Sequence, residues 1–282
     1  MKCELVDVFS TKKLNGNGLT IFSDVDHLSS ADMLAWTQEM RQFESIFIQV
    51  KGGEFHARIF TIEEELDFAG HPLLGLAYHL HHHYGNGPRH EWRVHTKSKV
   101  IPLTSLKTAE TFTATMSQGK PEFIRTLSEQ EAQTLYAALN LTPPSEVSIG
   151  AEVISTGLPY VILPVASHQL EHIVFKVKDL APLIAPLGAK FLYVLDVDNR
   201  EGRTWDNQGA VEDIATGSAA GPAAAYLFKH GLISSHELTL HQGRFLGRPS
   251  EINVAIAEHD GEIANIFVSA NVVKVADISL VD

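Results

Sequence analysis

The two halves of this sequence repeat similar local patterns in the same order. Residues 58–61 (RIFT) resemble residues 203–206 (RTWD), and residues 67–72 (DFAGHP) resemble residues 213–218 (DIATGS), which contain one inserted residue. Both of the latter stretches lead into a segment rich in small and apolar residues. Such a repeat is typical of a duplicated domain, although a shared strand–turn–helix order without duplication gives a similar pattern.

The repeat predicts a chain of two similar domains. With 282 residues, the chain is long enough for two domains of ordinary size. We predict an N-terminal domain over residues 1–117, a C-terminal domain over residues 122–265, and a last strand at about 266–282 that returns to the first domain. Clefts between domains are favoured ligand sites, so we expect the functional site in the cleft between the two.

Composition is that of a globular protein that does not cross a membrane. The chain is 44% hydrophobic and 20% charged, and no window approaches the roughly 18 apolar residues that a membrane span needs. The N-terminal stretch MKCELVDVFS places Glu4 and Asp7 where a signal peptide would be apolar. We therefore expect a cytoplasmic protein.

Charge and cysteine content exclude several classes of function. The formal net charge of −12 argues against nucleic acid or an anionic membrane as partner, because both require a basic face. Cys3 is the one cysteine, so the chain cannot form an internal disulfide, a CxxC redox pair or a multi-cysteine zinc site. A mechanism with two opposed thiols is excluded for the same reason.

Local patterns predict where helices and strands lie. Ser29 or Ser30 can cap a helix that runs to about residue 40, and residues 128–131 (SEQE) match a capping box for a helix that runs to about residue 139. Residues 70–83 predict a helix with Pro72 at its first position. Apolar and β-branched runs predict strands at 4–9, 19–22, 43–50, 55–60, 92–96, 99–103, 111–116, 153–155 and 160–163.

A glutamate stands within one of the predicted strands. Side chains alternate between two faces along residues 43–50 (FESIFIQV), so Glu44 shares a face with Ile46, Ile48 and Val50. An unpaired carboxylate is costly to bury among apolar side chains. Exposure at the strand end, an ion pair, or protonation with a raised pKa would each relieve that cost, and the last is what a general acid/base requires.

Two predicted helices begin with glycine and small polar residues, GHP at 70–72 and ATGSAAGP at 215–222. The first N–H groups of a helix lack internal partners and carry partial positive charge, so they can bind a substrate carboxylate. Gly70 and Gly217 would let a ligand approach the backbone closely, and Ser218 could cap its helix or donate to a ligand. Both stretches could equally be ordinary starts of buried helices. Neither matches the glycine patterns of nucleotide-binding loops or of serine-hydrolase elbows.

Several titratable residues have both a catalytic and a structural interpretation. His71 could donate a proton, bond a carboxylate or take part in the helix start, and Asp213, next to Glu212, could simply be solvated. His79 and His83 have the i, i+4 spacing of a metal pair, but the sequence shows neither HExxH nor a nearby carboxylate, so we predict a polar helix end and no metal site. Four arginines could bind a carboxylate or form structural ion pairs: Arg58, Arg203, Arg244 and Arg248.

Seven blocks of the sequence together form a recognisable order. They are 6–9 (VDVF), 15–17 (NGN), 44–47 (ESIF), 58–61 (RIFT), 67–72 (DFAGHP), 212–219 (EDIATGSA) and 241–244 (HQGR). In this order they resemble the PhzF-like phenazine-biosynthesis isomerases, and the resemblance covers nearly the whole chain. Two blocks depart from the family: Gly18 stands where the family has proline, and Pro72-Leu73 follow the Gly-His pair where others often have Ala-Thr.

The resemblance implies an α+β protein of the diaminopimelate-epimerase-like fold, with two pseudo-symmetric domains that each curl a sheet around a central helix. It implies that Glu44 is the catalytic acid/base and that His71 and Asp213 assist proton transfer or orient the substrate. The residues implied to bind the substrate's carboxylate are Gly70, Gly217 and Ser218. Thiol-based epimerases of this fold use two cysteines, and this chain has none at the matching positions.

The expected function is therefore a cofactor-independent isomerase of a small carboxylic-acid metabolite, with no metal. Its expected partner is the small-molecule substrate, and a homodimer is expected from the resemblance alone. Two alternatives stay open from the sequence: an amino-acid racemase or epimerase, which normally needs two opposed bases, and a non-catalytic protein that binds a small acid.

Overall fold

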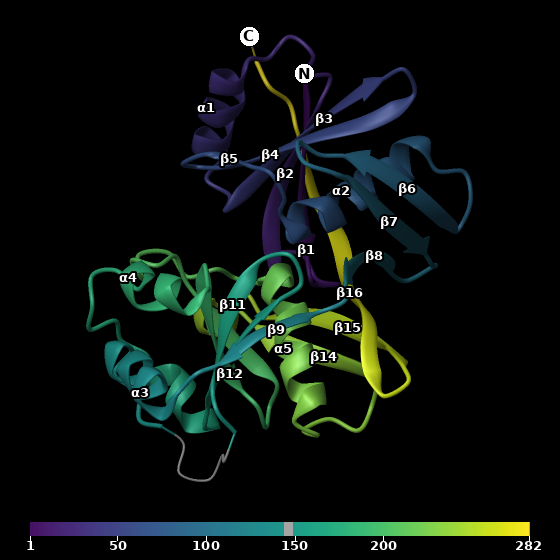
Figure 1. Ribbon diagram of the computed structural model, residues 1–282. Coiled ribbons are helices and arrows are strands. Elements are labelled where there is room, and N and C mark those ends of the chain that lie inside the picture. Colours follow the sequence, from purple (N-terminus) through teal and green to yellow (C-terminus); the bar gives the residue numbers. More distant parts are fainter. Residues whose placement is uncertain (144–148, 282) are drawn as a thin grey trace. The chain divides into compact units, whose positions relative to one another are not determined.

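The chain divides into two compact units that share one long strand. The computed structural model describes residues 1–143 and 149–281 (Figure 1). Unit 1 comprises Met1–Ser117, Gly247–Ser250 and the C-terminal stretch from Ser269, and unit 2 comprises Gln118–Leu246 and Glu251–Val268. Both units combine strands with helices, which confirms the predicted α+β class. No helix in the described part of the chain is both long enough and apolar enough to cross a membrane.

In unit 1 a closed sheet surrounds one helix. The strand order is β1-β2-β3-β4-β6-β7-β8-β16, and β1 also pairs with β16, so the sheet closes on itself. The enclosed helix α2 contacts five of these strands and buries eleven of its residues. The elements are β1 (Lys2–Val8), β2 (Asn17–Ser23), α1 (Ser30–Met40), β3 (Glu44–Lys51), β4 (Glu54–Thr61), β5 (Glu65–Leu66), α2 (Gly70–Tyr84), β6 (Arg89–His95), β7 (Val100–Lys107), β8 (Phe112–Gly119) and β16 (Glu262–Ile278).

A second helix covers the outer face of unit 1. Helix α1 packs on β3 and β4 and contributes Met33 to a buried cluster around Phe22 and Phe47, whose rings stack with centroids 4.6 Å apart. Strand β3 is therefore buried on both faces over its first five residues. Val50, which the alternation places on an apolar face, is exposed because it lies near the end of the strand beyond the two helices.

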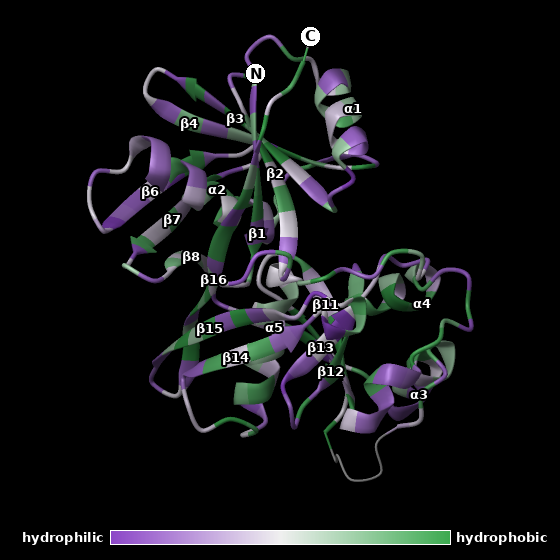
Figure 2. Cartoon of the chain, turned by 180° about the vertical axis from the view of Figure 1, so that it is seen from behind, coloured by the Kyte–Doolittle hydropathy of each residue, from purple (hydrophilic) through white to green (hydrophobic). Residues whose placement is uncertain are grey.

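Unit 2 repeats the arrangement around α5. Its strand order is β16-β15-β14-β13-β12-β11-β10-β9, and α5 packs on β10, β11 and β12. Figure 2 shows hydrophilic and hydrophobic bands alternating along β14 and β15, as expected for strands with one buried face. The elements are β9 (Glu122–Thr126), α3 (Glu129–Ala138), β10 (Glu152–Ser155), β11 (Pro159–Val165), η1 (Ser167–His172), α4 (Ala181–Ile184), η2 (Ala185–Leu187), β12 (Phe191–Asp196), β13 (Glu201–Thr204), α5 (Gly217–Lys229), β14 (Glu237–Gln242), η3 (Arg244–Leu246) and β15 (Ser250–His259).

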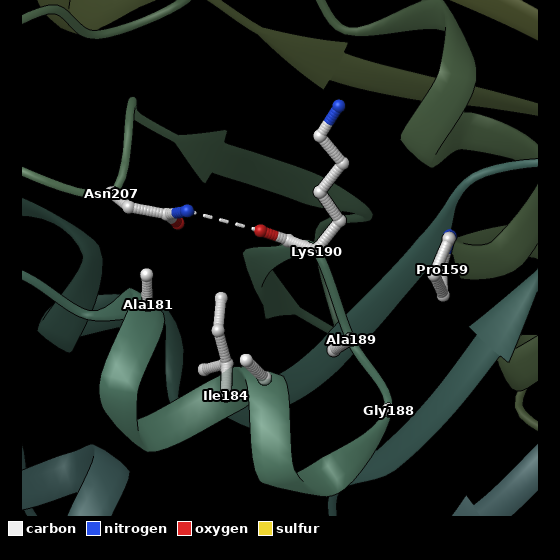
Figure 3. A pocket seen from close by; sticks show the side chains of 8 residues that line it. Pro159, Ala181, Ile184, Gly188, Ala189, Lys190 and Asn207 are labelled. Carbon is white, nitrogen blue, oxygen red and sulfur yellow. Dashed lines mark hydrogen bonds between the residues drawn. The ribbon is translucent and has the colours of Figure 1, made fainter.

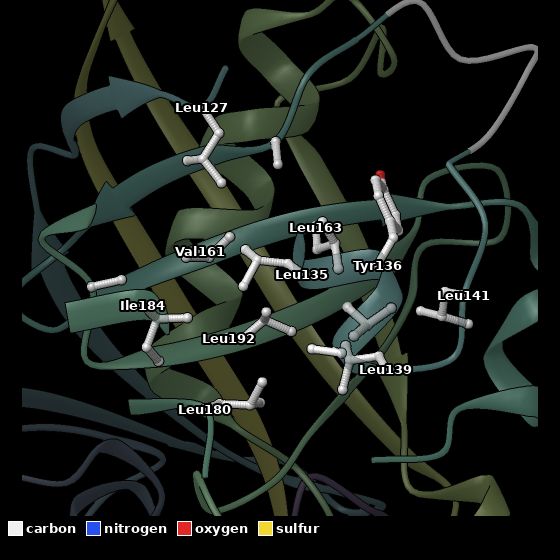
Figure 4. Close-up of a cluster of buried hydrophobic side chains, with 14 of the residues drawn as sticks. Leu127, Leu135, Tyr136, Leu139, Leu141, Val161, Leu163, Leu180, Ile184 and Leu192 are labelled. Atoms are coloured by element: carbon white, nitrogen blue, oxygen red, sulfur yellow. The ribbon is translucent and has the colours of Figure 1, made fainter. Parts of the chain in front are cut away.

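A separate hydrophobic cluster lies on the other face of this sheet. Side chains of α3, β11, β12 and α4 meet there, including Leu135, Leu163, Ile184 and Leu192 (Figure 4). The clusters of the two units thus form from different stretches of chain, and each unit has its own core.

The helix starts follow the sequence closely, with one shift. Ser29 and Ser128 each form a complete capping box, which confirms those two predictions and decides between Ser29 and Ser30. Helix α2 begins at Gly70, so the prediction that Pro72 occupies the first position is wrong by two residues. Proline is tolerated there because the first-turn N–H groups have no acceptor within the helix.

Candidate active site

Glu44 and His71 form a buried pair in unit 1. Oε2 of Glu44 lies 2.6 Å from Nδ1 of His71, and both side chains are less than 10% exposed. Glu44 is the first residue of β3 and His71 the second residue of α2, so the closed sheet around α2 brings them together. Of the three ways to relieve the cost of a buried carboxylate, the structure shows a close partner, the His71 side chain.

The second nitrogen of His71 is a candidate contact for a ligand. Nδ1 of His71 is engaged with the Glu44 carboxyl group, which leaves Nε2 as the remaining polar atom of the ring. Within the described residues, Nε2 is buried and makes no hydrogen bond. Buried polar atoms are normally satisfied in native proteins, so Nε2 of His71 is a candidate for a hydrogen bond to a bound molecule or to water. His71 is not a helix cap, because Ala69 holds that position.

Asp213 is held by a polar network in unit 2. Its Oδ2 accepts a hydrogen bond of 2.6 Å from the Thr216 hydroxyl, and its carbonyl accepts one of 2.9 Å from the Gln242 side chain. Its backbone N–H donates to the Thr204 carbonyl. Asp213 is therefore an ordered residue at the entrance to α5. Sequence reasoning did not single out Thr216 or Gln242, which counted only as members of the blocks 212–219 and 241–244.

The start of α5 presents backbone N–H groups without a side-chain cap. Thr216 is the N-cap residue, but it makes no side-chain cap bond and its hydroxyl donates to Asp213. Ser218 is the second helical residue and not a cap, and its hydroxyl lies 2.7 Å from the Tyr160 hydroxyl. Helix α2 likewise begins at Gly70 without a side-chain cap. The residues predicted to bind a carboxylate thus lie at two helix starts. At neither start does a side chain cap the first N–H groups.

Four arginines that could bind a carboxylate are all engaged in ion pairs. Arg58 pairs bidentately with Glu65 and Arg203 with Glu212, each through two hydrogen bonds of 2.6–2.8 Å. These two pairs occupy equivalent positions in the two units. The remaining pairs are Arg244 with Glu201 and Arg248 with Asp7.

The predicted polar end of α2 is in part a buried cluster. His79 is buried, with Nδ1 2.6 Å from Oε2 of Glu4, and Nε2 of His83 lies 3.2 Å from Oε1 of the same carboxylate. Donor atoms of these three residues lie within 4.8 Å of one another, so the carboxylate partner that the sequence did not reveal exists on β1. Lys274 donates to the same Oε1 at 2.9 Å. An ammonium thus already neutralises the carboxylate.

The Glu4 carboxylate is held in its ionised form. Burial by itself would raise the pKa of Glu4, but hydrogen bonds from His79, Lys274 and His83 outweigh burial and hold the pKa well below its ordinary value. In unit 2, Glu152 has the same kind of surroundings, with Lys229 at 2.8 Å and His230 at 2.9 Å. The repetition indicates a structural role at the C-terminal end of each central helix.

A surface pocket in unit 2 lacks the groups that acid/base chemistry needs. It has a volume of about 320 Å³, and its floor is mostly apolar. Figure 3 shows the Asn207 amide donating to the Lys190 carbonyl at its rim. None of the predicted site residues lines it. The other lining residues are Pro159, Ala181, Ile184, Ala185, Gly188 and Ala189.

The sequence-predicted residues therefore form two groups, each within one unit. Glu44, Gly70 and His71 lie together around the start of α2, whereas Asp213, Gly217 and Ser218 lie around the start of α5. That these groups act on one ligand in a cleft between the domains stays a prediction.

Comparisons with known proteins agree along the whole chain. The family model described as "Phenazine biosynthesis-like protein" matches residues 6–277. The trans-2,3-dihydro-3-hydroxyanthranilate isomerase of Pseudomonas aeruginosa is 32% identical over 282 residues, which covers 95% of this chain and 94% of that protein. A solved structure titled "Predicted Epimerase" from Pseudomonas aeruginosa is 45% identical with a TM-score of 0.92, and covers 100% of this chain and 99% of its own. A probable proline racemase from Agrobacterium radiobacter shares the fold alone, with 12% identity and a TM-score of 0.58 over 100% of this chain and 93% of its own. These structures confirm the predicted diaminopimelate-epimerase-like fold.

Proposed function

This chain belongs to the phenazine biosynthesis-like family and is an isomerase of a small molecule, and we propose that Glu44 is its acid/base. In the proposed reaction the Glu44 carboxylate takes a proton from a carbon next to an activating group. The double bond of the substrate shifts, and the resulting carboxylic acid returns the proton to another carbon of the same molecule. Atoms and charge balance without a redox step, so the reaction calls for no cofactor.

The observation that carries the proposal is the buried Glu44–His71 pair. Glu44 has His71 as a hydrogen-bond partner at 2.6 Å, and within the described residues Nε2 of this histidine is buried and unbonded. A carboxyl group and an imidazole within hydrogen-bond distance can exchange a proton, which is the arrangement that acid/base chemistry requires. The free nitrogen supports contact of His71 with the substrate.

Glu4 shows what an unsuitable carboxylate looks like in the same unit. It lies at the same 2.6 Å from a histidine of α2, but Lys274 and His83 also bond it and its pKa is held far below the ordinary value. A carboxylate with so low a proton affinity is a weak base near neutral pH. The contrast favours Glu44 over Glu4 as the base.

We propose that the helix starts bind the carboxylate of the substrate. Gly70 and Gly217 open α2 and α5 without side-chain caps, which leaves first-turn N–H groups of partial positive charge. Ser218 would add a hydroxyl donor, and Asp213 would orient a polar group of the substrate. A substrate with a carboxylate and an adjacent unsaturated carbon satisfies both sets of groups.

The substrate of one relative provides the first compound to assay. The relative that is 32% identical is named for trans-2,3-dihydro-3-hydroxyanthranilate, which meets the proposed chemistry by carrying a carboxylate. The relative with a solved structure that is 45% identical is titled an epimerase. The assay therefore includes both this compound and a fractionated metabolite extract.

The wild-type protein is incubated in D₂O, once with trans-2,3-dihydro-3-hydroxyanthranilate and once with the metabolite extract. Products are followed by mass spectrometry and ultraviolet absorbance. The expected result is a product of unchanged composition with a changed retention time, carrying deuterium where the proton exchanges with solvent. In Glu44→Gln the rate should fall by about 10²–10⁴-fold, because the general base is lost. A stereoisomer of the substrate with unchanged absorbance would instead identify a racemase or epimerase.

The matched control is Glu4→Gln. It removes an equally buried carboxylate that also lies 2.6 Å from a histidine of α2, so it reproduces the structural cost without touching the proposed base. We expect lower stability and near wild-type turnover per folded molecule. Equal turnover in Glu44→Gln and in wild type would exclude the proposed mechanism.

A further inference from the structure

Gln242 uses every hydrogen-bonding position of its side chain. It is the last residue of β14 and is 1% exposed. Its Oε1 accepts from the Thr216 backbone N–H at 3.2 Å and from the Tyr193 hydroxyl at 3.3 Å. Its Nε2 donates to the Asp213 carbonyl at 2.9 Å and to the Thr216 hydroxyl at 3.0 Å. A primary amide offers two donors and two acceptor positions, so all four are occupied.

The partners of Gln242 leave only one orientation for the amide. The Thr216 N–H can only donate and must face the oxygen, whereas the Asp213 carbonyl can only accept and must face the nitrogen. Burial raises the pKa of the Tyr193 hydroxyl, so this group stays protonated and donates as well. The side chain cannot flip without losing these bonds.

This orientation sets the direction of the Thr216 hydroxyl. Since Nε2 of Gln242 donates to the hydroxyl oxygen, the hydroxyl hydrogen is left to point at Oδ2 of Asp213, 2.6 Å away. The bonds therefore run in one direction, from Gln242 through Thr216 to the Asp213 carboxylate. Chained hydrogen bonds of this kind polarise and strengthen one another.

The fold itself does not call for this network. At the equivalent helix start in unit 1 the N-cap is Ala69, and Asp67, which the repeat aligns with Asp213, forms an exposed surface pair with Lys97. Two similar helices thus begin in one chain, and the aligned aspartate is held in a polar network only in unit 2. A difference between duplicated halves indicates a function that one half performs.

We propose that Gln242 is a positioning residue of the isomerase. Through Thr216 it orients the Asp213 carboxylate and keeps it hydrogen-bonded, and it holds the first residues of α5 in place. The proposal rests on the proposed role of Asp213 in orienting the substrate. The partners of the Gln242 side chain are Tyr193, Asp213 and Thr216.

Gln242→Glu tests the direction of the network with almost no change of shape. An ionised carboxylate has no donor, so the Thr216 hydroxyl would turn its hydrogen toward the introduced carboxylate and abandon Asp213. We expect the midpoint of the Asp213 carboxyl titration to move to higher pH, because a hydrogen bond to the charged form is lost and a second negative charge is introduced beside it. Gln242→Met introduces no charge, so its shift isolates the loss of the hydrogen-bond network. This is measured by ¹³C NMR on protein labelled at aspartate carboxyl carbons, with the signal assigned by Asp213→Asn.

Gln169→Glu is the matched control. Gln169 is a buried glutamine of the same unit. Like Gln242, it donates from Nε2 to one carbonyl and one threonine hydroxyl, in this case both of Thr142, at 3.0 and 2.6 Å. Its partner Thr142 is not a predicted site residue. This variant introduces the same buried charge and should lower the melting temperature comparably, but it should leave the Asp213 titration unchanged.

The second measurement is the turnover of the substrate that the D₂O assay identifies. We expect kcat in Gln242→Glu to fall about 10–100-fold relative to Gln169→Glu, as is typical for loss of a residue that orients a functional group, with KM changed less than about threefold. Should Gln242→Glu not fold, Gln242→Met removes the same donors without a buried charge and should shift the titration in the same direction, by less.

The outcomes separate the two proposals. An Asp213 titration that is the same in Gln242→Met and in wild type would overturn the positioning role, whatever the turnover. A shifted titration with turnover equal to the control would support the positioning of Asp213 and overturn its part in the proposed reaction. A shifted titration with reduced kcat supports both.

Discussion

At the scale of single residues, partners decide what a buried carboxylate can do. Glu44 and Glu4 both lie 2.6 Å from Nδ1 of a histidine on α2. Glu4 has Lys274 and His83 as further donors and is held as an anion. Glu44 has a single histidine partner whose other nitrogen is unbonded among the described residues. The same residue type thus serves as a structural ion in one place and as a candidate base in another.

The Glu4 cluster predicts a specific dependence of stability on pH. Because the pKa of Glu4 is lowered in the folded state, its contribution is complete above the unfolded-state pKa of about 4.3 and is lost as pH falls below that value. Glu4→Gln should therefore lower the free energy of unfolding by about 1–3 kcal/mol at pH 7. The difference from wild type should shrink as pH falls from 5 to 3, by at most about 1.4 kcal/mol per pH unit.

Urea unfolding of both proteins at several pH values measures this difference. Glu237→Gln serves as the control, because Glu237 is an exposed residue and should change stability little at any pH. A difference between Glu4→Gln and wild type that stays constant from pH 7 to pH 3 would show that the carboxylate charge is not what stabilises the cluster.

At the scale of elements, the helices differ in how they begin. The surface helices α1 and α3 start with complete capping boxes, whereas the central helices α2 and α5 start without a side-chain cap. The central helices gain their stability from burial, with eleven and ten buried residues, and do not depend on caps. Helix starts without a capping side chain are thus compatible with the fold.

Close packing of α2 against the sheet predicts the effect of adding one methyl group. A Cβ on Gly75 would lie 2.4 Å from Cδ2 of Leu19 and 3.0 Å from Cγ2 of Val8. In Gly75→Ala, overpacking should lower the free energy of unfolding by about 1–3 kcal/mol. The higher helix propensity of alanine should raise it by roughly 1 kcal/mol, so we expect a net loss of stability. Thermal and urea unfolding measure the net change.

Gly87→Ala is the control for this substitution. Its Cβ would meet nothing closer than 3.9 Å, so we expect little change in stability. Increased stability of Gly75→Ala would mean that Leu19 and Val8 can move aside and that helix propensity decides the outcome at this position.

At the scale of the whole molecule, the duplication extends from sequence motifs to contacts. The bidentate pairs of Arg58 with Glu65 and Arg203 with Glu212 are equivalent, and Glu4 and Glu152 each bond a histidine near the end of the central helix of their unit. The two helix starts differ: Ala69 is the N-cap residue of α2, whereas Thr216 is that of α5 and bonds Asp213.

Separate cores predict that each unit responds to its own core substitutions. Phe47→Ala removes a ring that stacks on Phe22 and meets Phe60 edge-on, and should cost unit 1 about 3–5 kcal/mol. Leu163→Ala should cost unit 2 about 2–5 kcal/mol, because Leu163 is fully buried in that unit's cluster. Hydrogen exchange followed by mass spectrometry should show lost protection mainly in peptides of the substituted unit. A uniform loss over both units would show that they unfold as one.

The sequence by itself determined the features that depend on local patterns and on order along the chain. The internal repeat and the helices with capping boxes follow from spacing and residue type, and the α+β class follows from the resemblance of seven ordered blocks to a known family. Glu44 was a candidate because a charged residue in an apolar strand needs an explanation, and that argument requires only its neighbours in sequence.

Only the tertiary structure decided which distant residues are partners. Glu4 meets His79 and Lys274, and Glu44 meets His71, because a closed sheet brings separate strands against one helix. The prediction that the histidines of α2 form a polar helix end failed for His79, since nothing local to the helix reveals a carboxylate on β1. The contact of Gln242 with Asp213 was hidden for the same reason. A hydrogen bond depends on distance and direction in space, and residues 213 and 242 are close only after the chain has folded.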